Sequence, residues 1–263
     1  MTAAAQPATS STSNPVLNDQ SFQRAQAGAG AGAAAMTARG AYVKTMFLMV
    51  LLVIAAVFGW NQVRVIEFNG QQLALAPSWT WGVMLLAFIV ALIGAFAPKV
   101  APIAAVLYAL LQGTMLGIVS AFYNLEFEGI VLQAVLLTVC IFTAMLLLYT
   151  LGIIKVTSGF VMGVIGAMSG LLLLYVVAWL LSLFGINLAF LYAPTPLGIG
   201  IALFIVVLAA LNLPLDFAFI QRAAAAKAPK FMEWYGAFGL MLSIIWIYVS
   251  ILRLLALMRM SRR

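Results

Sequence analysis

An acidic side chain lies inside one of the long apolar stretches of this sequence. The segment LNLPLDFAFI, residues 211–220, holds Asp216 two residues after Pro214 and four residues after Asn212. In a helix, positions four apart share a face, and a proline leaves the carbonyl four residues earlier, here that of Ala210, without its usual N–H donor. Oxygen atoms of this kind suit hard cations such as Ca²⁺, but one carboxylate does not make a dedicated cage. No certain metal site is therefore predicted.

A carboxylate inside a membrane span is energetically costly, which makes Asp216 a candidate for a functional role. A charged group within a membrane span costs about 2.5 to 3.5 kcal/mol on insertion scales, so Asp216 should face protein or water and is a functional candidate. Desolvation opposes its ionised form, which would make it proton-sensitive. The alternative is structural, because Asp216 lies close to the basic turn that holds Arg222 and would then anchor a helix end.

Other polar residues are spaced so that they can meet Asp216 across a bundle. The last apolar stretch carries small and polar residues at steps of three and four: Gly236, Gly239, Ser243, Trp246, Ser250 and Arg253. This spacing places them on one helical face, which we expect to point inward. Gln112 is a further candidate for the same interior, with a purely structural hydrogen bond as the alternative.

The residue inventory argues against catalysis. The chain has no histidine, which excludes Ser-His and Cys-His pairs, HExxH zinc sites and histidine-ligated haem. Aspartyl proteolysis needs two carboxylates in one site, and only Asp216 is expected within a span. No glycine-rich phosphate loop or aromatic-basic nucleic-acid patch is found. We therefore expect a protein that is not an enzyme, has no catalytic residues, binds no nucleic acid and needs no cofactor.

The elements that position these residues are expected to be membrane-spanning helices. With 66% hydrophobic and 7% charged residues, the chain has too little polar surface for a water-soluble globule. Most of its apolar stretches reach the ~17–25 residues that cross a bilayer as a helix. They cover residues 43–60, 79–97, 100–123, 130–154, 159–184, 196–220 and 235–258. The predicted fold class is an all-α, polytopic membrane protein with seven spanning helices.

The chain divides into two parts by composition. Residues 1–40 are rich in Ala, Gly, Ser, Thr and Gln, so a disordered N-terminal tail is expected there. Residues 41–263 then form the membrane domain. The single cysteine, Cys140, lies in the middle of an apolar stretch and is expected to be a small buried thiol.

Basic residues indicate the orientation. One set of connections holds Arg24, Arg39, Lys44, Lys99, Lys155, Arg222, Lys227 and Lys230, while the other holds Arg64, Glu67, Glu126 and Glu128. The positive-inside rule then predicts a cytoplasmic N-terminus. Seven crossings would place the basic C-terminal RMSRR segment outside, against the same rule. Either that tail is exported, or one apolar segment dips in and returns, leaving six crossings.

Short connections and glycines predict how the helices pack. The links APKVAP, NLEFEG and the few residues around Lys155 should make sequence neighbours antiparallel hairpins. Small residues allow close helix contact: Gly113, Gly117, Gly159, Gly163, Gly166 and Gly170. These contacts are expected within the chain, and a homodimer seam is the alternative.

Several segments resemble the Bax inhibitor-1/YccA family, in particular its actinobacterial branch. They are SNPVLN (13–18), LYALLQGTMLGIVSAFY (107–123), LNLPLDFAFI (211–220) and MEWYGAFGLMLSIIWIYVSILRLL (232–255). The resemblance implies a bundle in which three hairpins surround the last, central helix. It also implies membership of a group that includes pH-sensitive Ca²⁺ leak channels and a modulator of a membrane-bound protease.

The resemblance assigns a role to Asp216 and shows two departures. Asp216 matches one aspartate of the family's pH-sensing pair, and the second aspartate falls on Ser243. A carboxylate would then face a hydroxyl, so no two-carboxylate pair is available to share a proton. The arginine that some members carry in their second helix is also missing, since residues 79–97 contain no charge.

Two functional hypotheses follow. In the first, Asp216, Ser243, Asn212 and Gln112 form a pH-influenced pathway for calcium or another cation, and Glu126 and Glu128 form an outer vestibule. The two glutamates also precede the helix at 130–154, where its dipole favours negative charge. In the second, the protein does not conduct and regulates other membrane proteins, such as a membrane-bound protease. Both hypotheses place a multi-pass protein in a bacterial cell membrane.

Overall fold

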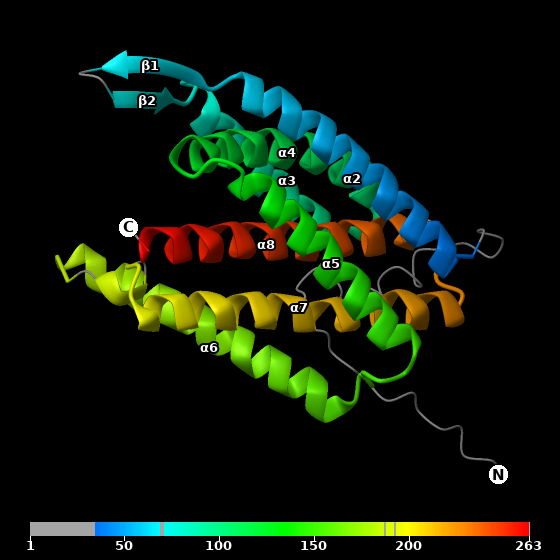
Figure 1. Ribbon diagram of the computed structural model, residues 1–263. Coiled ribbons are helices and arrows are strands. Elements are labelled where there is room, and N and C mark those ends of the chain that lie inside the picture. Colours follow the sequence, from blue (N-terminus) through cyan, green and yellow to red (C-terminus); the bar gives the residue numbers. More distant parts are fainter. Residues whose placement is uncertain (1–34, 69–70, 187, 192, 263) are drawn as a thin grey trace, which may run out of the picture.

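The computed structural model describes residues 35–68, 71–186, 188–191 and 193–262. Across these ranges the chain forms seven α-helices, one hairpin of two strands and two short 3-10 helices (Figure 1). The helices are α2 (Ala38–Asn61), α3 (Thr80–Phe96), α4 (Ala101–Glu126), α5 (Ile130–Thr150), α6 (Ser158–Leu183), α7 (Pro196–Ala225) and α8 (Met232–Met260). The remaining elements are β1 (Arg64–Phe68), β2 (Gln71–Leu75), η1 (Pro98–Val100) and η2 (Ala189–Leu191).

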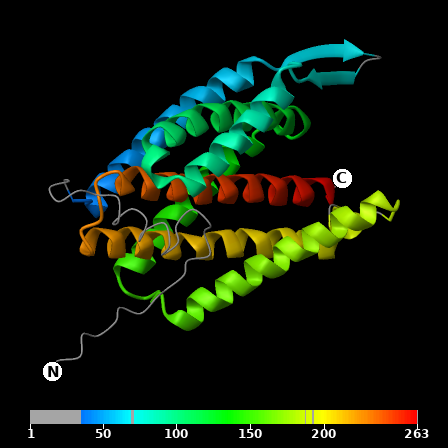
Figure 2. The same cartoon turned by 180° about the vertical axis from the view of Figure 1, so that it is seen from behind.

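The helices confirm a polytopic all-α membrane protein that contacts the lipid bilayer. Among the described residues, six helices are long and apolar enough to cross a membrane, and α3, with 17 residues, is shorter. Both views place the start of α2 at one end of the bundle and the end of α8 at the other (Figures 1 and 2). We call these the basic end and the distal end. The helical part of the described chain therefore begins and ends at opposite ends of the bundle.

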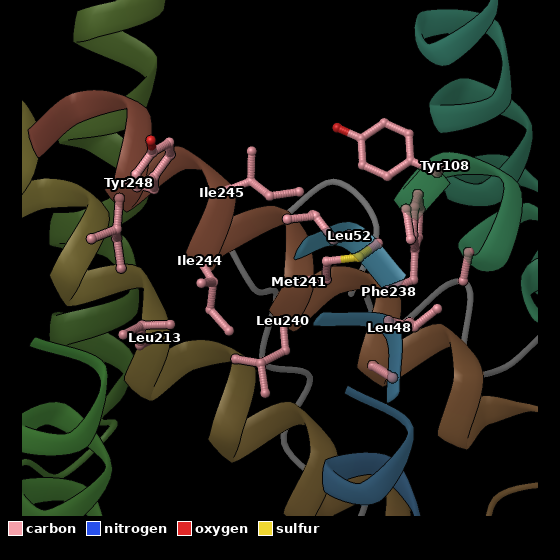
Figure 3. Close-up of a cluster of buried hydrophobic side chains, with 14 of the residues drawn as sticks. Leu48, Leu52, Tyr108, Leu213, Phe238, Leu240, Met241, Ile244, Ile245 and Tyr248 are labelled. Atoms are coloured by element: carbon pink, nitrogen blue, oxygen red, sulfur yellow. The ribbon is translucent and has the colours of Figure 1, made fainter. Parts of the chain in front are cut away.

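The central position of the last helix is also confirmed. Helix α8 contacts α2, α4, α5 and α7, and most of its length is buried. Figure 3 shows its side chains Phe238 and Met241 among Leu48 and Leu52 of α2 and Tyr108 of α4. The rings of Tyr108 and Phe238 meet edge to face with centroids 5.4 Å apart. The core therefore consists of apolar side chains of the surrounding helices that pack around α8.

Glycines bring α2 and α4 into backbone contact. A β-carbon at Gly117 would overlap the backbone of Ala56, and one at Gly113 would lie 2.9 Å from the β-carbon of Ala55. Gly59 of α2 meets the backbone of Thr114 in the same way. The predicted intrachain packing is therefore confirmed for α4, whose main partner is α2 rather than a sequence neighbour.

Helix α6 does not follow the packing that its glycines predicted. A β-carbon at any of the four positions, Gly159, Gly163, Gly166 and Gly170, would meet no atom of the described residues within 4 Å. The helix packs against α7 through a small cluster that includes Val161, Val164, Leu208 and Leu215. The predicted α5–α6 hairpin is also wrong, because the two helices are joined by a turn but do not pack along each other. Short links require proximity only at the ends of helices.

The structure also bears on the expected burial of Cys140 and on the expected start of the membrane domain. Cys140 is exposed on α5, so the expected buried thiol is wrong. Helix α2 begins at Ala38, before the predicted domain boundary at residue 40, and Thr37 caps it by accepting a hydrogen bond from the Gly40 N–H at 3.0 Å. Met36 N–H donates to the Ala228 carbonyl at 2.7 Å. The rest of the predicted tail, residues 1–34, lies outside the described residues.

Candidate functional site

Helix α7 carries the acidic residue through the interior. The helix continues across Pro214, which has no N–H to donate to the carbonyl of Ala210. Asp216 has no exposed surface and Asn212 is 3% exposed, because both face α8. The sequence expectation that Asp216 faces protein rather than lipid agrees with this position.

Asn212, Ser243 and Asp216 form one hydrogen-bonded unit, which we call the buried polar cluster. The Ser243 hydroxyl on α8 donates to Asp216 Oδ2 on α7, and Asn212 Nδ2 donates to Ser243 Oγ at 2.9 Å. The polarity runs in one direction, from amide through hydroxyl to carboxylate. Such a chain stabilises negative charge on the acceptor at its end. The cluster therefore places an oriented acceptor group between the central helix and α7.

The buried polar cluster is shielded from solvent, since Asp216 has no exposed surface and Asn212 and Ser243 are each 3% exposed. Leu213, Leu215 and Phe217, which flank Asp216 on α7, are fully buried. Asp216 precedes the end of α7 at Ala225 by nine residues, about 14 Å at the helical rise of 1.5 Å per residue. An ion could reach the carboxylate only after side chains or helices move. The described conformation is closed at this point.

The remaining predicted site residues lie elsewhere. Gln112 is half-buried on α4, and no hydrogen bond within the described chain joins it to the buried polar cluster. Glu126 and Glu128 are exposed around the α4–α5 turn at the distal end. There Arg259 of α8 donates to the Glu128 carbonyl at 2.8 Å and to Gln133 Oε1 at 3.1 Å. The structure thus brings together three of the six predicted residues.

A second buried carboxylate was missed in the sequence. Glu233, in the first turn of α8, is fully buried and forms ion pairs with Lys44 of α2 and with Lys230, the latter at 2.9 Å between Nζ and Oε1. Its Oε1 also accepts from the N–H of Thr37 at 2.9 Å and from the Thr37 hydroxyl at 3.0 Å. We call this the basic-end carboxylate. One sequence feature could have predicted this site: Glu233 is a lone acidic residue beside a basic connection and lies three residues after Lys230.

The polar stripe predicted on the last helix does point inward. Gly236, Gly239, Ser243 and Ser250 are buried. Arg253 donates to the Tyr175 hydroxyl of α6 at 2.8 Å and to the Leu191 carbonyl of η2 at 2.5 Å. These contacts hold α6 and the α6–α7 connection to the central helix near the distal end. Arg253 therefore has a structural role.

A metal ion needs several ligand side chains that lie close together. Within the part of the chain that the structure describes, no three His, Cys, Asp or Glu residues group closely enough to hold a metal ion. Asp216 and Glu233 both face protein partners, a hydroxyl in one case and two ammonium groups in the other. The buried polar cluster contains a single carboxylate, that of Asp216.

The fold and the cluster can be compared with known proteins. A family model described as Bax inhibitor 1 like matches residues 14–260. A search of curated proteins and a search of solved structures each found no match. The family match covers nearly all of the chain, including every described helix, the buried polar cluster and the basic-end carboxylate. This membrane-spanning chain belongs to the Bax inhibitor 1 like family.

Proposed function

We propose that this protein provides a pH-influenced leak pathway for calcium or a similar cation, with the buried polar cluster as its inner constriction. The observation that carries the proposal is the fully buried Asp216 carboxylate, held by Ser243 at the α7–α8 interface. A buried acid inside a membrane bundle is costly, and such residues commonly serve ion or proton pathways. The proline two residues earlier adds a point where α7 can bend.

The proposed mechanism follows from what the carboxylate can bind. In the closed conformation Asp216 accepts the Ser243 hydroxyl. Movement of α7 relative to α8 would replace that donor by water or a passing cation, and the negative charge would then favour cations over anions. A proton competes with the cation for the same oxygen atoms. The proposed flux therefore falls as the pH is lowered through the range in which Asp216 takes up a proton.

The orientation and membrane are part of the proposal. Basic residues of the described chain gather toward the basic end: Arg39, Lys44, Lys99, Lys155, Arg222, Lys227 and Lys230. By the positive-inside rule this end, and with it the N-terminus, would be cytoplasmic in a bacterial cell membrane. Arg64, Arg259 and Arg262 at the distal end oppose the rule but are fewer. No enzymatic role is proposed, since the chain lacks histidine.

The second candidate is a non-conducting regulator of other membrane proteins, such as a membrane-bound protease. It is favoured by the outward side of α6, where four glycine positions have no neighbour within 4 Å and where a partner helix would approach closely. The closed surroundings of Asp216 also suit a protein that does not conduct. In this case the buried polar cluster serves as a structural lock between α7 and α8.

Calcium flux into liposomes separates the two candidates. Purified protein would be reconstituted into vesicles that contain a calcium dye, and entry would be followed from about pH 6 to 8, the window where a buried carboxylate can titrate. The leak proposal predicts entry above that of protein-free vesicles and a decrease toward the acidic end. Entry equal to that of protein-free vesicles across this range would reject the leak and leave the regulator as the better candidate.

A further inference from the structure

A cavity opens at the basic end of the bundle, between the end of α5, the α5–α6 turn and the last turns of α7. Its volume is about 530 Å³. The polar lining residues are Tyr149, Thr150, Lys155, Gln221 and Arg222, and the apolar ones are Ile154, Val156, Ala218 and Ala225. This size lies in the range of about 300–1,000 Å³ that small-molecule sites occupy.

The turn that forms one wall has a defined structure. Gly152 takes a left-handed conformation with φ of 71°, and the Leu148 carbonyl accepts from the N–H groups of Ile153 and Ile154 at 3.0 and 3.1 Å. This arrangement ends α5 in the way that glycine C-caps do. The Lys155 carbonyl then accepts from Thr157 N–H at 2.9 Å just before α6. The turn therefore holds Lys155 at the cavity instead of leaving it on a free loop.

The opposite wall comes from α7. The Tyr149 hydroxyl of α5 donates to Gln221 Oε1 at 2.8 Å, which ties the two walls together. Gln221 uses its oxygen as the acceptor in this bond, and its amide nitrogen carries two N–H donors. Arg222 follows directly on the helix. Two cationic residues and an amide thus line the cavity, one from the α5–α6 turn and two from α7.

The lining favours an anion. No acidic residue among those that the structure describes lines the cavity, while Lys155 and Arg222 bring two positive charges and Gln221 brings an amide group. Guanidinium and ammonium groups together are the usual partners of phosphate, which has several acceptor oxygens. The expected ligand group is therefore a phosphate.

The position of the cavity identifies the source of that phosphate. Leu147, Leu151 and Ile153 next to it are 54%, 71% and 66% exposed, so the surface below the cavity is apolar and faces lipid. Ile154 and Val156 continue this apolar surface into the cavity itself. Basic pockets between helices at the membrane interface are suited to anionic lipid headgroups. A soluble phosphate ion would use the cations but none of the apolar wall.

We propose that this cavity binds the phosphate headgroup of an anionic phospholipid from the leaflet at the basic end, with Lys155 and Arg222 on the phosphate. The acyl chains lie along the exposed apolar faces of α5 and the α5–α6 turn. The bound lipid links that turn to α7. The inference is independent of whether the protein conducts ions.

The test measures lipid retention by the full chain. Detergent-purified protein would be titrated with phosphatidylglycerol, and bound lipid would be counted by native mass spectrometry. The double variant Lys155→Gln/Arg222→Gln should weaken phosphatidylglycerol binding by about tenfold or more, since each basic residue near an anionic lipid contributes roughly fivefold. The matched variant Arg39→Gln/Lys99→Gln removes the same two charge types from exposed positions outside the cavity and should change binding by less than about twofold.

Further arms separate lipid from other ligands and from misfolding. The exchange Lys155→Arg/Arg222→Lys keeps both charges and should retain lipid binding. All variants should elute from size-exclusion chromatography at the wild-type volume, which shows that they are folded. Phosphatidylcholine should bind more weakly than phosphatidylglycerol. Equal losses in the two Gln double variants would overturn the proposal, because the effect would then be general charge. Displacement of the lipid by millimolar inorganic phosphate would overturn its assignment to a lipid.

Discussion

Ser243 of α8 donates its hydroxyl hydrogen to Asp216 of α7, and its oxygen accepts from the side-chain amide of Asn212. One hydroxyl therefore connects the central helix to both polar residues that flank Pro214 on α7. All three residues are buried, so their hydrogen bonds have little competition from water. Any change at position 243 acts on the two helices together.

Ser243→Ala should destabilise the bundle by about 1–3 kcal/mol, because it removes a donor from the buried Asp216 carboxylate and an acceptor from Asn212. Thermal unfolding in detergent, followed by tryptophan fluorescence, measures the effect. Ser250→Ala is the matched control, since Ser250 is buried on the same helix outside the buried polar cluster; it should cost less than Ser243→Ala, because it removes no donor from the Asp216 carboxylate. Equal shifts for both variants would contradict the importance of the cluster.

Substitutions at Asp216 and Ser243 should change the pH dependence of any calcium flux in opposite directions. Asp216→Asn removes the charge that attracts cations and should lower the flux and flatten its pH dependence. Ser243→Asp places a second carboxylate opposite the first, and two close carboxylates titrate as a coupled pair, so the pH dependence should become steeper. Dye-reported entry into proteoliposomes from about pH 6 to 8 gives both profiles. Unchanged profiles in both variants would remove Asp216 from the pathway.

Glu233→Gln should loosen the start of α2 as well as the start of α8. The change removes the charge that Lys44 and Lys230 share and weakens the acceptor of Thr37, at a cost of about 1–3 kcal/mol. Limited digestion with trypsin should then cleave after Arg39 faster than in the wild type. Glu128→Gln, an exposed acid at the distal end, is the control and should leave the cleavage rate unchanged. A slow Glu233→Gln digest would mean that the segment is held by other contacts.

The same Gly→Ala change should have opposite effects on α4 and α6. At Gly117 the added methyl group overlaps the backbone of Ala56, so α2 and α4 must separate, with a loss of about 1–3 kcal/mol. At Gly163 it meets nothing within 4 Å, and the better helix propensity of alanine should leave the protein equally or more stable. Melting temperatures of the two variants in one detergent test this. A destabilised Gly163→Ala would point to a partner on α6.

Cysteine labelling tests the proposed orientation. In a Cys140→Ser background, Lys227→Cys at the basic end should react only with a membrane-permeant maleimide. Glu128→Cys at the distal end should react with an impermeant reagent added to intact cells. The two exposed positions serve as controls for each other. The opposite pattern would invert the topology and place the N-terminus outside.

The sequence predicted the buried polar cluster better than it predicted the helix partners. Asn212 and Asp216 are four residues apart, and this spacing alone places them on one face of α7. The assignment of Ser243 as their partner needed the family resemblance as well, because nothing local relates α7 to α8. Gln112 was expected in the same interior, but it is half-buried on α4, and no hydrogen bond of the described chain joins it to the cluster.

The sequence by itself determined the membrane class, the helices and the family, because these follow from apolar length and local spacing, which the bilayer makes strict. Only the tertiary structure decided which helices meet. Gly117 packs on α2, while Gly163, with the same local signal, faces open space. The partners of Glu233 include Lys44, which is 189 residues away in the sequence, and Thr37. Such contacts depend on the close fit of distant surfaces, and a single chain read in order carries no local signal for that fit.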